Sequence, residues 1–129
     1  MNTKLVDELQ RYFDKNDNVS MAFLFGSHAK NRALHDSDID IAVCLKNNNK
    51  RYFDKIWNDI ERLVPAHVDL INLKQTYATL AFEAIKGIKL KIEQEDKYIE
   101  FMLKISQEAV DFQEFIIDLW NLKKRWGNA

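Results

Sequence analysis

The chain has 129 residues, and its 19 lysines and arginines nearly balance 20 aspartates and glutamates, for a formal net charge of −1. This length fits one domain with its own hydrophobic core, so we expect residues 1–129 to form a single domain. With 30% charged and 47% hydrophobic residues the chain does not have the composition of a disordered protein. The lack of a basic excess argues against direct binding of nucleic acid.

The N-terminus and the cysteine content indicate the compartment. The segment Met1–Leu5 has no apolar stretch of the kind a signal peptide carries, and apolar runs such as Met21–Phe25 are too short to span a membrane. Cys44 is the one cysteine, so it has no partner for an internal disulfide, which fits a reducing compartment. We expect a cytoplasmic protein without membrane contact.

In the first half of the chain, helices and strands are predicted to alternate. Apolar residues three and four apart predict a helix over Thr3–Lys15, and the apolar run Val19–Phe25 predicts a strand covered on both faces. A short helix is expected over Ser27–Lys30. Asp38–Leu45 alternates as a strand, with isoleucines on one face and two aspartates on the other. A helix follows over Tyr52–Val64.

The second half of the chain also alternates between strands and helices, and it ends in a long helix. His67–Leu73 predicts a strand, residues 76–86 a short helix, and Ile88–Ile92 another strand. The segment from Gln94 to Arg125 predicts one long helix, straight or kinked. The order indicates an α/β fold with a small mixed sheet flanked by helices, a core over about residues 1–92 and a helical tail over about residues 94–126.

Apolar residues recur through the tail at heptad-like spacing. Part of such a stripe is expected to pack on the sheet. The helix is long for this domain, however, and further apolar residues lie beside the stripe: Phe101, Phe115, Ile117 and Trp120. Two interpretations therefore stay open for the tail, a part of the core or a surface that binds a partner protein.

Three aspartates are the candidate metal ligands. Asp38 and Asp40 are two residues apart, so in a strand they share a face, about 6.6 Å apart at the backbone. Two anions this close repel unless a cation joins them, and a divalent ion that prefers oxygen, most simply Mg²⁺, meets that need. Asp69 adds a third ligand if its strand pairs beside theirs. The alternative is solvated turn residues, with Asp69 paired to a lysine.

A Gly-Ser pair and two basic residues are the candidate phosphate ligands. Gly26 ends a strand, which allows a ligand to approach the backbone closely, and Ser27 begins a helix whose free N–H groups favour anions. Lys30 and Arg32 follow within reach of a polyphosphate. Phosphate ligands beside metal ligands describe a nucleoside triphosphate site. The alternative is an ordinary turn with Ser27 as a helix cap and exposed basic side chains.

Two other metal sites are excluded. The segment from Asp36 begins like a calcium loop, but Ile41 stands where that loop needs glycine and Asn47 where it needs an acid. The three histidines lack the spacing and the cysteine partners of a zinc site. His67 shares strand parity with Asp69, which puts it at the rim of the site, and His28 directly follows the serine. For both, an ordinary structural or surface role is favoured.

The motif Gly26-Ser27, ten residues, then Asp38-Ile39-Asp40 and a later Asp69 resembles the minimal nucleotidyltransferase (MNT) family of the DNA polymerase β-like superfamily. The second half is similar to the tails of MNT antitoxins at Phe82–Leu90 and at Val110–Phe112. Those antitoxins pair with HEPN-domain RNase toxins. The resemblance therefore implies a polymerase β-like fold and a hetero-oligomer with a HEPN toxin.

The resemblance also implies a reaction. In that family AMP is transferred from ATP to a tyrosine of the toxin, and this modification silences the toxin. By match of position, Asp38 and Asp40 would hold two Mg²⁺ ions. Asp69 completes the metal that activates the attacking hydroxyl, while Gly26 and Ser27 hold the triphosphate.

One departure from the family and two alternative functions remain. Asn31 stands where many members have glycine, but asparagine tolerates a left-handed backbone, so we expect the turn to survive. An antitoxin that neutralises by binding alone is one alternative. A small-molecule nucleotidyltransferase of the aminoglycoside-modifying type is the other, although only a helical tail is left after Leu73 to form a substrate domain.

Overall fold

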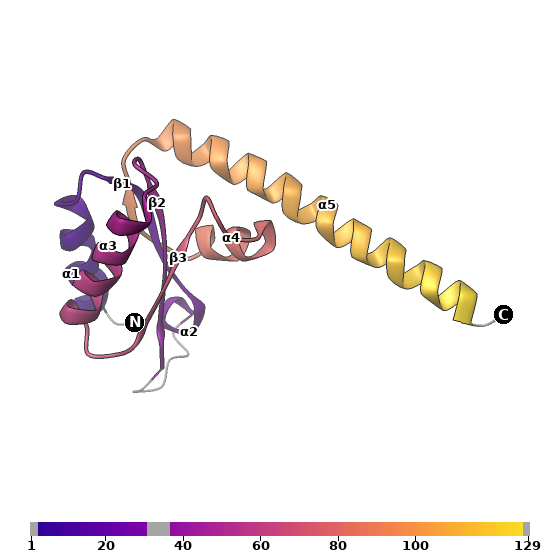
Figure 1. Ribbon diagram of the computed structural model, residues 1–129, viewed down its shortest axis with the longest axis horizontal. Coiled ribbons are helices and arrows are strands. Elements are labelled where there is room, and N and C mark those ends of the chain that lie inside the picture. The colour runs from indigo at the N-terminus through magenta and orange to yellow at the C-terminus, as the bar shows by residue number, and fades with distance from the viewer. Residues whose placement is uncertain (1–2, 31–36, 128–129) are drawn as a thin grey trace.

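The computed structural model describes residues 3–30 and 37–127 (Figure 1). Its elements, in chain order, are α1 (Thr3–Asp14), β1 (Val19–Phe25), α2 (Gly26–Ala29), β2 (Ile39–Leu45), α3 (Lys50–Leu63), β3 (Val68–Asn72), α4 (Ala78–Ile85), β4 (Ile88–Ile92) and α5 (Glu95–Gly127). Each predicted element is present within one or two residues of its expected bounds. The expected left-handed cap at Asn31 lies outside the described residues.

The strands form one mixed sheet in the order β3-β2-β1-β4. β1 pairs antiparallel with β2 and with β4, whereas β2 pairs parallel with β3. A parallel pair needs a crossover connection, and α3 supplies it. The structure confirms the predicted α/β fold with a small mixed sheet and a long C-terminal helix.

Local signals set the bounds of the crossover helix α3. The Asn49 side chain accepts a hydrogen bond from the Arg51 backbone N–H at 2.8 Å, which caps the helix start. The helix ends at Leu63, shortly before Pro65. The Trp57 indole N–H donates to the Val68 carbonyl oxygen at 2.9 Å. This bond ties α3 to the first residue of β3 and so helps to place that strand beside β2.

The alternation of β2 divides its side chains between two hydrophobic clusters. Ile39, Ile41 and Val43 pack with buried residues of α1 and α3, while Ala42 and Cys44 pack with residues of α4 and α5. Figure 1 shows α1 and α3 on one side of the sheet and α4 and α5 on the other. Asp40 has the parity of Ala42 and therefore lies on the α4 and α5 side.

Helix α5 is continuous, and only its first half belongs to the core. Tyr98, Ile105 and Ala109 are buried, but every residue from 110 to 125 is exposed. Figure 1 shows the second half of α5 extending away from the sheet. The stripe of apolar residues is thus core up to Ala109 and open surface beyond it. Among the described residues, no helix is long and apolar enough to cross a membrane.

Candidate functional site

The parallel register of β2 and β3 brings two aspartates side by side. Asp40 is the direct neighbour of Asp69 across the ladder, and Ile39 is the neighbour of Val68. The Ile39 N–H also donates to the His67 carbonyl oxygen at 2.8 Å, which continues the pairing one step before β3 begins. The strand pairing that Asp69 needs to join the other aspartates is therefore present.

The Gly-Ser pair lies at the same end of the sheet as Asp40 and Asp69. Phe25, the last residue of β1, lies opposite Asp40 in the antiparallel ladder, and α2 starts at the next residue. Gly26 and Ser27 therefore follow directly beside the Asp38–Asp40 strand entry. The two halves of the predicted site come from segments that meet at one end of the sheet.

Asp38, His67 and Asp69 form a group that can hold a metal ion. Each offers one ligand atom, and the three atoms lie within 4.8 Å of one another, all on exposed side chains. The His67 Nε2 atom is 3.5 Å from Asp69 Oδ1. The sequence favoured an ordinary structural or surface role for His67. The strand parity that His67 shares with Asp69 was the one signal that placed it near the site.

Asp40 lies beside this group in a more enclosed position. Burial raises the pKa of the Asp40 carboxyl above its ordinary value, and the nearby charges of Asp69 and Asp38 raise it further, while His28 opposes the shift. An anion that is both partly desolvated and repelled by two others is stabilised by a cation. The carboxylates of Asp38 and Asp69, with the imidazole of His67, fit a divalent metal ion, and the Asp40 carboxylate lies next to them without belonging to that group.

Gly26 is required at its position for two reasons. Its φ is +72°, a left-handed conformation that side chains disfavour. A Cβ atom at this residue would also overlap the Oδ2 atom of Asp40. From the sequence, Gly26 was expected to let a ligand approach the backbone closely. The structure adds that the missing side chain makes room for the Asp40 carboxylate.

Helix α2 is a single turn, and Ser27 does not cap it. The cap position is Phe25, which makes no side-chain cap hydrogen bond, and Ser27 sits half-buried inside the turn. His28, the next residue of the turn, contacts the chain just before β2: its Nε2 atom is 3.1 Å from the Ser37 carbonyl oxygen. That contact joins α2 to the residue before Asp38, a positioning role that the sequence did not reveal.

The two predicted basic ligands follow helix α2, with Lys30 at its C-cap position. Lys30 is exposed, and its charge acts on Glu83 of α4, where it adds to the stronger effect of Lys86 in lowering the pKa of that carboxyl. Arg32 lies outside the described residues.

These features define a class of protein: a small mixed sheet with a Gly-Ser turn and three aspartates at one end is the arrangement of a nucleotidyltransferase. The profile of the family described as "Polymerase beta, Nucleotidyltransferase" matches residues 7–97. The chain belongs to this polymerase β nucleotidyltransferase family. The comparison with curated proteins found no match.

Solved structures share the fold over nearly the whole chain. A chain of a toxin–antitoxin crystal structure with AMP-PNP is 21% identical with a TM-score of 0.69, and the alignment covers 93% of this chain and 99% of that one. A chain in the structure of tri-AMPylated Shewanella oneidensis HEPN toxin in complex with MNT antitoxin is 20% identical with a TM-score of 0.66. That alignment covers 93% of this chain and 99% of the other. A chain of the toxin–antitoxin pair MntA-HepT is 19% identical with a TM-score of 0.61, and the alignment covers 92% of this chain and 95% of that one. The fold expected from the MNT resemblance is confirmed.

Proposed function

We propose that this chain is an antitoxin protein adenylyltransferase that transfers AMP from ATP to a tyrosine of a partner HEPN RNase toxin. The observation that carries the proposal is the β2–β3 register, which sets Asp40 beside Asp69 and next to the Gly-Ser turn. Structural relatives that contain AMP-PNP or a tri-AMPylated HEPN toxin support the choice of nucleotide and of partner.

The aspartates are the proposed metal ligands. Asp38 and Asp40 hold two Mg²⁺ ions, Asp69 shares in one of them, and the proximity of His67 makes it an additional ligand. Bound Mg²⁺ ions would neutralise the charge of the phosphates and favour ionisation of the attacking hydroxyl. Within the chain, Asp69 accepts the proton of that hydroxyl or orients it, because it is the exposed carboxylate on β3.

The Gly-Ser turn is the proposed triphosphate site. The left-handed Gly26, followed by the helical turn of α2, gives a succession of backbone N–H groups that can converge on an anion. The Ser27 hydroxyl adds a donor. Lys30 and Arg32 are proposed as further phosphate ligands.

The distal half of α5 is the proposed toxin-binding surface. An isolated helix that exposes large apolar side chains is poorly stabilised in water without a partner. The exposed apolar residues beyond the core are Val110, Phe112, Phe115, Ile116, Ile117, Leu119, Trp120 and Leu122. In this proposal residues 1–92 form the catalytic core, residues 94–126 form the binding tail, and the complex with the toxin is a hetero-oligomer in the cytoplasm.

Intact-mass spectrometry of the partner toxin tests the proposal. The purified chain is incubated with the HEPN protein encoded beside it, ATP and Mg²⁺. One or more AMP increments on the toxin are expected, with none in EDTA or with Asp38→Asn. Asp54→Asn is the matched control, because Asp54 is an exposed aspartate on α3, away from the site.

Two other results would replace the proposal. A toxin that binds the chain but stays unmodified would identify an antitoxin that acts by binding alone. Transfer of AMP to an aminoglycoside, with no modification of any protein, would identify a small-molecule nucleotidyltransferase.

A further inference from the structure

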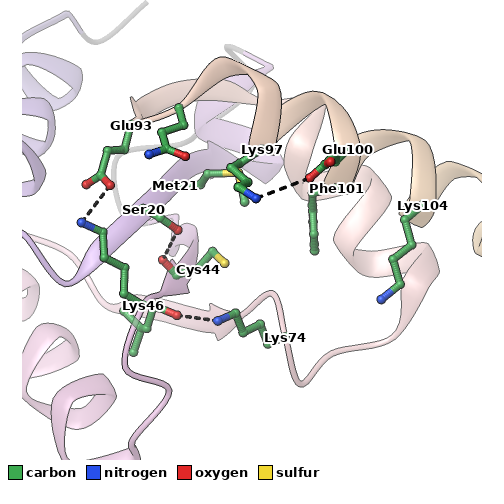
Figure 2. Close-up of a pocket in the computed structure, with 12 residues that line it drawn as sticks. Ser20, Met21, Cys44, Lys46, Lys74, Glu93, Lys97, Glu100, Phe101 and Lys104 are labelled. Carbon is green, nitrogen blue, oxygen red and sulfur yellow. Dashed lines mark hydrogen bonds and ion pairs between the residues drawn. The ribbon is translucent and has the colours of Figure 1, made fainter.

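Figure 2 shows a pocket of about 480 Å³. Its lining residues on β1 and β2 lie at the opposite end of these strands from Asp40 and Phe25. It is bounded by the start of β1, the end of β2 and the first turns of α5, with Ser20, Cys44 and Phe101 among its lining residues. None of the aspartates or histidines of the candidate site lines it. Along β2, Asp40 and Cys44 are four residues apart, a separation of about 13 Å. The pocket is therefore distinct from the nucleotide site.

The floor of the pocket is apolar. Met21 and Cys44 are almost completely buried in the core beneath it, at 4% and 6% exposure. Figure 2 shows the Phe101 ring projecting from α5 toward the space above the sheet. The volume falls within the range of about 300–1,000 Å³ that small-molecule pockets occupy in proteins. An aromatic ring beside buried sulfur atoms suits a flat apolar ligand.

The rim of the pocket carries a positive charge excess, since four lysines and two glutamates line it. Lys46 pairs with Glu93 at 2.8 Å, and Lys97 pairs loosely with Glu100 at 3.9 Å. The two remaining lysines have no carboxylate partner among the described residues.

Those two lysines line the pocket from different segments, Lys74 from the turn after β3 and Lys104 from α5. The Lys74 side chain is exposed, and its ammonium donates to the Leu45 carbonyl oxygen, a neutral acceptor, at 2.7 Å. Lys104 projects from α5 on another side of the pocket (Figure 2). Two exposed ammonium groups outside an ion pair, beside an apolar floor, favour a ligand that is apolar at one end and anionic at the other.

We infer that this chain has a second small-molecule site, which binds a flat or slender apolar molecule carrying one phosphate or carboxylate group. The apolar body lies against Met21, Cys44 and Phe101, and the anionic group lies between Lys74 and Lys104. The site is independent of the proposed transfer reaction. A fatty acid, with its slender chain, and a nucleoside monophosphate, whose base has a flat aromatic face, are two sources of this chemistry.

Methyl NMR of the full chain with ¹³C-methyl methionine tests the inference. 1-Naphthyl phosphate is the probe, in EDTA so that no metal occupies the aspartates. The Met21 signal is expected to shift and saturate with a dissociation constant of about 1 mM or lower. Met102 is the internal control, because it packs against the same core cluster without lining the pocket. AMP and decanoate, titrated in parallel, identify the source by which of them moves Met21.

The charge requirement is tested with one exposed lysine. Lys104→Glu is expected to weaken binding of the probe at least about tenfold, whereas Lys55→Glu, an exposed charge reversal on α3, leaves it unchanged. The inference is wrong if Met21 is unmoved by all three small molecules, or if Lys104→Glu binds the probe as the parent does. A Met21 signal that responds only to the toxin would also overturn it, since the pocket would then be a protein interface.

Discussion

Replacing Gly26 by alanine tests the geometry that holds the candidate site together. The backbone at Gly26 is left-handed, which costs a residue with a Cβ atom about 1–2 kcal/mol. The new Cβ atom would also overlap the Asp40 carboxylate, and overpacking of this kind costs about 1–3 kcal/mol. Because Asp40 is only partly buried and can rotate toward solvent, we expect the lower part of that range. The two effects give a loss of about 2–4 kcal/mol in the free energy of unfolding.

Urea denaturation of a double-mutant cycle separates the two effects. In an Asp40→Ala background the overlap is gone, so Gly26→Ala should cost about 1 kcal/mol or more less than in the parent chain. Gly87→Ala is the matched control, because its Cβ atom would overlap the Leu24 carbonyl oxygen instead. Its cost should not depend on Asp40.

Two outcomes would refute this reasoning. If Gly26→Ala costs less than about 0.5 kcal/mol in the parent chain, the left-handed backbone at Gly26 is wrong. If its cost is the same with and without the Asp40 carboxylate, within about 0.5 kcal/mol, the two residues are not in contact.

Three further predictions concern single side chains. Tyr12→Phe removes the hydrogen bond that the hydroxyl donates to Asp59 at 2.8 Å and should lower the unfolding free energy by about 1 kcal/mol in urea; an unchanged midpoint would contradict that bond. In EDTA, Asp40→Asn should raise the melting temperature at pH 7. Folding raises the pKa of the Asp40 carboxyl, so the folded protein loses stability as the pH rises from the unfolded-state pKa of about 3.8 through the native pKa. The gain from Asp40→Asn should therefore vanish at pH values below that window. Mn²⁺ binding followed by electron paramagnetic resonance should weaken about tenfold in His67→Ala, and an equal affinity would remove His67 from the ligand set.

The periodicity of the sequence was sufficient to predict the elements but not their arrangement. Helical spacing and strand alternation are local, so bounds such as Val19–Phe25 follow from the residues themselves. The order β3-β2-β1-β4 depends on long-range pairing, which no local pattern encodes. The same reason explains His67: its place beside Asp38 becomes visible only once β3 is known to pair with β2.

The extent of the exposed part of α5 follows from dimensions rather than from its pattern. The helix has 33 residues, about 50 Å at 1.5 Å per residue, whereas strands of five to seven residues are about 17–23 Å long. The helix is therefore about twice as long as the longest of these strands, and the sheet cannot cover all of it. The heptad-like stripe continues through both halves, so the stripe alone does not reveal that the core ends at Ala109.

The pocket beside Phe101 left no signal in the sequence. Its floor comes from β1 and β2, and its basic rim comes from Lys74 and from α5, segments that are far apart in the chain. Each lysine taken singly reads as an ordinary exposed charge. Only the packing of α5 over the end of the sheet gathers them around one space.

The central claim is that the chain silences its partner by catalysis, and titrating the toxin's RNase activity tests this most directly. The toxin is incubated with ATP, Mg²⁺ and the chain at about one part in twenty, a ratio at which only a catalyst that turns over can reach every toxin molecule. We predict that the RNase activity falls nearly to zero with the parent chain and stays high with Asp40→Asn. Neutralisation that requires equal amounts of the two proteins, and that Asp40→Asn supports equally well, would contradict the account.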